Sequence, residues 1–110
     1  CTIASTVDVS FSVNVTTQWL EGVSVVGSIA ALGTWATASG YNLSATTYTS
    51  TNPIWSGGPV SLAAGTSFQY KFIKYNSTSN AVTWESGSNR DYTVPRSCAT
   101  TALVSGVWQA

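Results

Sequence analysis

The clearest pattern in the chain is a strict alternation of apolar and polar residues close to its start. Polar side chains stand between the apolar positions, which are Val7, Val9, Phe11, Val13 and Val15. Successive side chains of a β-strand point to opposite faces, so this period of two predicts a strand with one buried face.

Further runs of β-branched and aromatic residues follow at 23–28, 60–62, 68–75, 81–84, 91–94 and 101–108. Clusters rich in Gly, Pro, Ser and Asn separate several of them, at 56–59, 64–66 and 86–89, and these favour turns. No window shows the apolar stripe of an amphipathic helix. The pattern predicts an all-β fold, an antiparallel β-sandwich of about seven to eight strands. The least regular stretch, 30–52, is expected to form long surface loops, which are the usual carriers of binding function.

Length and charge narrow the possible functions. The chain has 110 residues, which predicts a single domain over 1–110, and its four Lys and Arg residues cancel its four Asp and Glu residues. A neutral chain without a basic stripe is not expected to bind nucleic acid or an anionic membrane. The absence of His and the scarcity of carboxylates leave no metal site and no Ser-His-Asp or Cys-His arrangement, so we expect no catalytic residue, metal or cofactor.

The polar surface comes mainly from hydroxyl groups. Serine and threonine together number 33, whereas charged residues make up only 7% of the chain. This balance suits an extracellular protein that meets a neutral ligand. Three Asn-x-Ser/Thr sequons, at Asn14, Asn42 and Asn76, agree with secretion and possible N-glycosylation. The chain begins on Cys1 without the features of a signal peptide, so we expect the domain to belong to a longer secreted precursor.

The two cysteines stand at opposite ends of the chain, at Cys1 and Cys98. A lone pair with this separation fits neither a zinc site nor a redox Cys-x-x-Cys motif. A disulfide between them would close a loop of almost the whole chain, which the chain-entropy model values at roughly 4 to 5 kcal/mol. The alternative is a pair of buried free thiols.

Some of the five tryptophans stand where a core residue is not expected. Trp19 and Trp35 each follow a short polar or glycine-containing segment, in turn or loop contexts. Such an aromatic residue either folds back onto the core or is displayed, and displayed apolar surface usually marks an interaction site. A sugar ring is a suitable partner, because its C–H edge meets the negative face of the aromatic ring.

A second aromatic position lies at the end of a predicted strand, in the segment 84–90. Trp84, Glu85, Asn89 and Arg90 provide a ring, an acid, an amide and a guanidinium group within seven residues. These groups could form a sugar subsite. The alternative is a plain turn, held by a contact of Arg90 with Glu85 or Asp91.

The aromatic run at 68–75 also carries a lysine. Alternation places Phe68, Tyr70 and Phe72 on one face of the predicted strand and Lys71 on the other. Lys71 is therefore either an ordinary exposed strand residue or a hydrogen-bond donor on the opposite face.

Several motifs together resemble one known family. They are the segments 27–35 (GSIAALGTW) and 68–73 (FQYKFI), Trp84-Glu85 with Asn89-Arg90, and 92–95 (YTVP). In order and spacing they resemble the starch-binding domain of fungal glucoamylases, carbohydrate-binding module family 20, from Cys1 to about Trp108. The resemblance implies an immunoglobulin-like β-sandwich without catalytic activity. It also implies two separate sites for starch, malto-oligosaccharides and cyclodextrins.

The resemblance assigns residues to the first site one by one. It implies that Trp35 and Trp84 form a paired stacking platform. It also implies that Lys71, Glu85 and Asn89 form hydrogen bonds with glucose hydroxyls. All five positions match the family pattern, although Trp35 lacks the acidic neighbours that often flank it.

The second site matches the family less closely. The family uses two tyrosines there, and the corresponding positions are Trp19 and Tyr48, with Trp55 nearby. Tryptophan at position 19 keeps the aromatic surface but lacks the phenolic hydroxyl. Without the resemblance, a core position is the alternative for Trp55 and the interpretation for Trp108.

The favoured hypothesis is a monomeric, non-catalytic module that tethers a glucoamylase-type catalytic domain to granular starch. Two alternatives stay open. A glycosidase would need two carboxylates around one sugar, and the available ones are Asp8, Glu21, Glu85 and Asp91. An immunoglobulin-like domain that binds a protein partner would instead carry its disulfide between the sheets.

Overall fold

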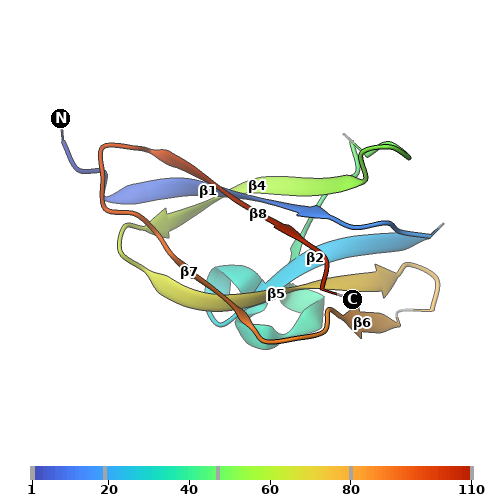
Figure 1. The fold of residues 1–110 in the computed structure, drawn as a ribbon. Helices are drawn as coiled ribbons and strands as arrows, with labels where there is room; N and C mark the ends of the chain where they lie inside the picture. The colour runs from blue at the N-terminus through green and yellow to red at the C-terminus, as the bar shows by residue number, and fades with distance from the viewer. Residues whose placement is uncertain (1, 19, 47, 80, 110) are drawn as a thin grey trace.

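The computed structural model describes residues 2–18, 20–46, 48–79 and 81–109. They form two β-sheets that pack face to face, with two short 3-10 helices beside the lower sheet (Figure 1). The elements are β1 (Thr6–Asn14), β2 (Glu21–Gly27), η1 (Ala30–Trp35), η2 (Thr37–Ser39), β3 (Tyr41–Asn42), β4 (Ile54–Ala63), β5 (Ser67–Asn76), β6 (Val82–Trp84), β7 (Arg90–Thr93) and β8 (Thr101–Val107). The described chain therefore has the predicted all-β sandwich, with eight strands.

The two sheets differ in size. One has the order β4-β1-β8, and the other has the order β3-β2-β5-β6, with β7 also paired to β5. One part of the prediction is wrong, because the sandwich is not purely antiparallel: β8 runs parallel to β1. A parallel neighbour needs a long crossover connection, and here most of the chain lies between the two strands.

The core lies between the sheets and confirms the two strand patterns that the sequence showed most clearly. In β1, the side chains of Val7, Val9, Phe11 and Val13 are fully buried. In β5, Phe68, Tyr70 and Phe72 are buried in the same core. The other face of each strand lies outside this core, and on that face of β5 Lys71 is half-buried whereas Ile73 is buried.

The predicted turn at 56–59 is wrong, because these residues lie inside β4. Val60 pairs with Val9 and Gly57 pairs with Phe11, so two residues of β4 oppose the single residue Ser10. This is a β-bulge, and the extra residue explains why Gly and Pro occur within a strand. Gly58 has a φ of 124°, a conformation that favours glycine.

The described part of the stretch 30–52 has more regular structure than the predicted long loops. It contains η1, η2 and β3, and its buried residues Leu32 and Leu43 pack into the core. The short β3 pairs with β2 and extends the larger sheet. The stretch is therefore anchored at several points to the sheet that it crosses.

Cys98 is not a free thiol. Its predicted partner, Cys1, lies outside the described residues, so the pairing stays a prediction. In the part of the chain that the structure describes, no helix is long and apolar enough to cross a membrane.

Candidate ligand-binding site

Two tryptophans far apart in the sequence come together beside the larger sheet. The ring centroids of Trp35 and Trp84 lie 6.3 Å apart, and their planes are inclined by 44°. Trp84 is 40% exposed and Trp35 is half-buried. The two rings, called the platform below, offer an apolar surface to solvent.

Trp84 is displayed because it ends a short edge strand. It pairs with Ile73 of β5, and directly opposed residues of an antiparallel pair share one face of the sheet. Ile73 lies on the face of β5 opposite to Phe72, which points into the core. The indole of Trp84 therefore stands on the outer face of the sandwich.

Trp35 is displayed by an unusual backbone. Gly33, Thr34 and Trp35 have φ values of 81°, 49° and 67°, so three consecutive residues lie in the left-handed region. This conformation is rare for a β-branched residue such as Thr34. A Cβ atom at Gly33 would lie 2.6 Å from the backbone of Ser39, which explains the glycine. Such strain gathers at functional sites, and here it is tied to the orientation of Trp35.

Lys71 occupies the outer face of β5, as its position in the alternation predicts. Its Nζ atom donates a hydrogen bond to the backbone carbonyl of Glu85 at 3.1 Å. Glu85 directly follows Trp84, so this contact holds the ammonium group close to the platform.

Glu85 fills a gap in the sheet. β6 and β7 pair with different parts of the same edge of β5, and Phe72 stands between the two paired segments. The backbone N–H of Phe72 donates to Glu85 Oε1 at 3.1 Å, and its carbonyl accepts the N–H of Glu85 at 3.2 Å. The glutamate thus satisfies two backbone groups that no strand pairs at this position.

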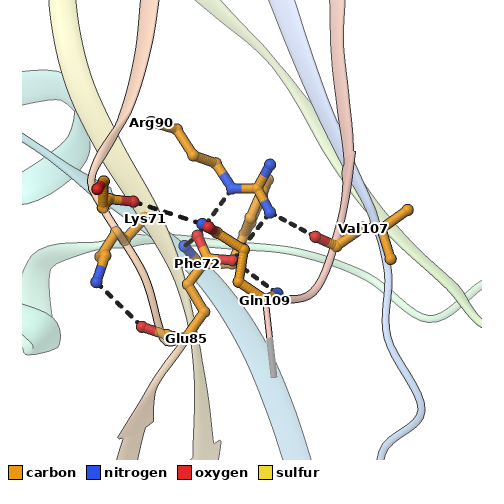
Figure 2. Close-up of polar contacts among 7 residues, drawn as sticks. Lys71, Phe72, Glu85, Arg90, Val107 and Gln109 are labelled. Carbon is orange, nitrogen blue, oxygen red and sulfur yellow. Dashed lines mark hydrogen bonds and ion pairs between the residues drawn. The ribbon is translucent and has the colours of Figure 1, made fainter.

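Further donors surround the same carboxylate, as Figure 2 shows. The guanidinium group of Arg90 donates to both oxygens, from Nε at 2.8 Å and from Nη2 at 2.9 Å. The N–H of Gln109 donates to Oε2 at 3.2 Å, and Arg90 also donates to the carbonyl of Val107. We call this set of contacts the brace, because it connects the end of β8 to Glu85, the residue that follows Trp84 of the platform.

The brace changes the pKa values of both ionised groups. Burial by itself raises the pKa of Glu85, but the hydrogen bonds from Arg90, Phe72 and Gln109 outweigh it and lower the pKa below its usual range. The hydrogen bonds that Arg90 donates to Glu85 raise the pKa of Arg90, against the opposing effect of burial. Both groups therefore stay charged across the neutral and mildly acidic range.

This geometry corrects the role predicted for Glu85. Its side chain is fully buried, and both carboxylate oxygens accept hydrogen bonds from the protein. It cannot also face a sugar hydroxyl, so it does not fit the direct contact that the resemblance implied. The contact of Arg90 with Glu85, which the alternative interpretation of the segment 84–90 predicted, is present.

Asn89 lies in the exposed loop between Glu85 and β7. Its Nδ2 atom donates to Oε1 of Gln69 at 3.3 Å, and Gln69 shares a face of β5 with Lys71. The structure thus brings four of the predicted residues together. Trp35 contacts Trp84, Glu85 follows Trp84 in the chain, and Lys71 donates to the carbonyl of Glu85. Asn89 is attached to the same face of the sheet through Gln69.

A second aromatic pair lies at one end of β4. The rings of Tyr48 and Trp55 have centroids 6.3 Å apart and meet edge to face, at 64°. Trp55 Nε1 donates to the hydroxyl of Thr17 at 3.3 Å, and the N–H of Thr17 donates to the Tyr48 hydroxyl at 3.3 Å. Trp19, predicted to belong to this site, lies outside the described residues.

Trp55 and Trp108, for which a core position was the alternative, both pack partly buried against the core. For Trp55 the two interpretations are compatible, because its ring also contacts Tyr48.

Sequence reasoning did not assign roles to two residues of these sites, Thr17 and Gln109. Neither residue carried a signal in the sequence, because each makes its contact with a distant segment. Their contacts join segments that are 38 and 24 residues apart.

A neutral β-sandwich that displays paired aromatic rings beside hydrogen-bonding groups has the architecture of a carbohydrate-binding domain. The family model described as "Starch binding domain" matches residues 6–104. The chain belongs to this family of starch-binding domains.

Relatives with this domain are much longer proteins. The chain is 49% identical over 109 residues to an AA13 family lytic polysaccharide monooxygenase A of Aspergillus terreus, covering 98% of this chain and 27% of that protein. It is 47% identical over 109 residues to a glucoamylase of Neurospora crassa, covering 99% of this chain and 17% of that protein. The chain thus spans about a quarter or less of these relatives.

Solved structures agree with the fold. A Glycoside Hydrolase Family 15 glucoamylase from Hypocrea jecorina superposes with a TM-score of 0.93 and 38% identity, over 100% of this chain and 18% of that one. The family 20 carbohydrate-binding module of a maltotetraose-forming amylase from Pseudomonas saccharophila gives a TM-score of 0.74 and 29% identity. That match covers 93% of this chain and 100% of the module.

Proposed function

We propose that this chain is a non-catalytic module that binds starch, malto-oligosaccharides and cyclodextrins through two aromatic sites. The observation that carries the proposal is the exposed platform of Trp35 and Trp84, in a domain of the starch-binding family. The platform stacks against the apolar faces of glucose residues, and Lys71 and Asn89 form hydrogen bonds with glucose hydroxyls. Glu85 acts as a positioning residue, through its carbonyl to Lys71 and its carboxylate to Arg90.

The second site consists of Tyr48 and Trp55, together with Trp19. Stacking with a few neutral hydrogen bonds gives each site a modest affinity, on the order of 4 to 8 kcal/mol, or micromolar to millimolar. Two such sites on one module raise its residence on a multivalent glucan through effective concentration.

In the whole protein, the module keeps an attached catalytic domain at the surface of starch granules. Its relatives include both a glucoamylase and a lytic polysaccharide monooxygenase. The relatives thus carry this domain with more than one kind of catalytic partner, among them a glycosidase and an oxidative enzyme. We further propose a secreted, monomeric module with a Cys1–Cys98 disulfide and with sequons at Asn14, Asn42 and Asn76 that can carry N-glycans.

The geometry gives no support to a glycosidase within the module. A hydrolase of this type needs one carboxyl group that can protonate the leaving oxygen. Glu85 is enclosed in its ion pair with a lowered pKa, and Glu21 accepts the backbone N–H of Gln18.

The test is a double substitution, Trp35→Ala with Trp84→Ala. We expect cyclodextrin affinity at the first site to fall by at least about 30-fold, the loss of roughly 2 kcal/mol that defines a binding hot spot. Isothermal titration with β-cyclodextrin and adsorption to raw starch measure the effect. Leu103→Ala is the matched control, because Leu103 is an apolar residue of the other sheet that is 65% exposed.

Unchanged adsorption and unchanged cyclodextrin affinity in the double variant would overturn the assignment of the platform. Absence of any cyclodextrin or starch binding by the wild-type domain would overturn the function itself.

A further inference from the structure

The outer face of the larger sheet carries a groove next to the platform, with a volume of about 340 Å³. Its floor contains Ser24 of β2 and Ile73 of β5, and Asn42 of β3 lies at one side. Tyr75 and Val82 form another side, and residues of η2 lie at the rim. This volume is within the range of sites that hold small ligands.

The register of the sheet makes the groove continuous with the platform. Asn42 pairs with Ser24, Ser24 pairs with Ile73, and Ile73 pairs with Trp84. Opposed residues of antiparallel strands share one face, so these four residues form a row across four strands on the outer face. The row begins in the groove and ends at the platform.

Residues close in sequence to each tryptophan of the platform also line the groove. Trp84 and Val82 are two residues apart in β6, so their side chains share a face. On the other side, Trp35 is followed by η2, whose first residue Thr37 lines the groove. A ligand that leaves the platform along this sheet therefore enters the space between η2 and β6.

The surface of the groove suits a neutral sugar. The ring of Tyr75 lies against Gly22, where a Cβ atom would lie 2.2 Å from the ring, and Val82 is 38% exposed. At the other side, the Ser24 hydroxyl donates to Asn42 Oδ1 at 2.7 Å, and the Asn42 amide group carries two N–H donors. None of the described residues that line the groove is charged.

We propose that the groove of Ser24, Asn42, Ile73, Tyr75 and Val82 is an extension subsite, which holds further glucose residues of the same α-glucan chain that stacks on the platform. This inference rests on the proposed function and deepens it. The apolar faces of Tyr75 and Val82 contact the sugar rings, and the Asn42 amide hydrogen-bonds a hydroxyl. Long linear oligosaccharides therefore bind the first site more tightly than short ones.

Glycosylation of the sequon at Asn42 would affect binding in the proposed subsite. A glycan attached to the Asn42 side chain would occupy the groove and exclude the ligand from it. The test therefore uses unglycosylated protein, and the substitution Tyr48→Ala removes the contribution of the second site.

In this background, isothermal titration compares maltotriose with maltoheptaose. Val82→Asn removes the apolar wall at an exposed position, and Ser24→Phe fills the groove. We expect each substitution to lower the ratio of maltoheptaose to maltotriose affinity at least threefold, without changing the maltotriose affinity. Leu103→Asn, an equivalent exposed substitution on the other sheet, should leave the ratio unchanged.

If Ser24→Phe does not fold, as judged by circular dichroism, Val82→Asn decides the result alone. Normal binding of both oligosaccharides with an unchanged ratio in the groove variants overturns the subsite and leaves the proposed function intact. Failure of the background protein to bind either oligosaccharide, together with failure of the wild type, overturns both.

Discussion

The two aromatic pairs of this domain have the same separation but are built differently. In each pair the ring centroids lie 6.3 Å apart. Trp35 and Trp84 are tilted by 44°, whereas Tyr48 and Trp55 meet edge to face at 64°. The edge-to-face pair is a stable arrangement for two rings packing on each other. In the tilted pair Trp84 is exposed, whereas both rings of the edge-to-face pair are half-buried.

The supports behind the two pairs differ as well. The platform rests on the brace, in which one buried carboxylate accepts four hydrogen bonds from three segments of the chain. The second pair is held by two longer hydrogen bonds to Thr17. We therefore expect the proposed first site to be the more rigid of the two before a ligand arrives, and to lose less entropy on binding than the proposed second site.

The largest expected effect comes from breaking the brace with Arg90→Ala. It leaves the buried carboxylate of Glu85 without its charged partner, so we expect the free energy of unfolding to fall by about 3 to 5 kcal/mol. Urea denaturation measures this loss. Arg96→Ala, at an exposed arginine, is the control and should change stability by no more than about 0.5 kcal/mol.

In folded Arg90→Ala protein, binding at the platform should weaken while binding at the second site stays. Equal weakening of both sites, resolved by titrating variants that keep only one site, would show that the brace supports the fold in general and not the platform.

Acid should weaken the same brace by a smaller amount. The pKa of Glu85 is lowered in the folded state, so its stabilisation is present above the unfolded value of about 4.3 and is lost as the pH falls through the folded pKa. Glu85→Gln should make unfolding free energy less dependent on pH below about 4.3, by up to about 1.4 kcal/mol per pH unit. Denaturation curves of the wild type and the variant test this. They are recorded between about pH 2.5 and pH 6, a range that includes the reference pKa of a glutamate. Identical slopes would contradict it.

The smallest effect should come from Thr17→Val at the second pair. This change removes the acceptor of the Trp55 indole N–H and keeps the backbone N–H that contacts Tyr48. One lost hydrogen bond of this kind costs about 1 kcal/mol. We expect a loss of about that size in unfolding free energy and weaker cyclodextrin binding at the second site only. Thr16→Val, at the exposed neighbouring residue, is the control, and all variants are compared as unglycosylated protein because Thr16 belongs to the sequon at Asn14. A change at the platform would contradict the independence of the two sites.

The sequence predicted best where one local pattern was enough. The alternation in β1 and β5 predicted which side chains are buried and put Lys71 on the outer face. It also indicated an all-β sandwich. Each of these features depends only on the period of two that any strand imposes on neighbouring side chains.

The order of the motifs predicted more than the local alternation did. It indicated the family and predicted that Trp35 pairs with Trp84. It failed for Glu85, whose type suggested a ligand contact although its carboxylate is buried. Local composition failed at 56–59, where Gly58 serves a bulge inside β4 and not a turn. In both cases a residue type that usually has one structural role has a different role here. Its contacts with a neighbouring strand determine which role it takes.

By itself, then, the sequence determined the fold class, the buried faces of the main strands, the neutral and aromatic character of the surface, and the family. Only the tertiary structure decided that Glu85 is buried in the brace, that Thr17 contacts both residues of the second pair, and that Asn42, Ser24, Ile73 and Trp84 line up across four strands. The physical reason is that periodicity and residue type act between near neighbours in the chain. Strand register, a gap in a sheet edge and the choice of a hydrogen-bond partner depend on segments that meet only after folding.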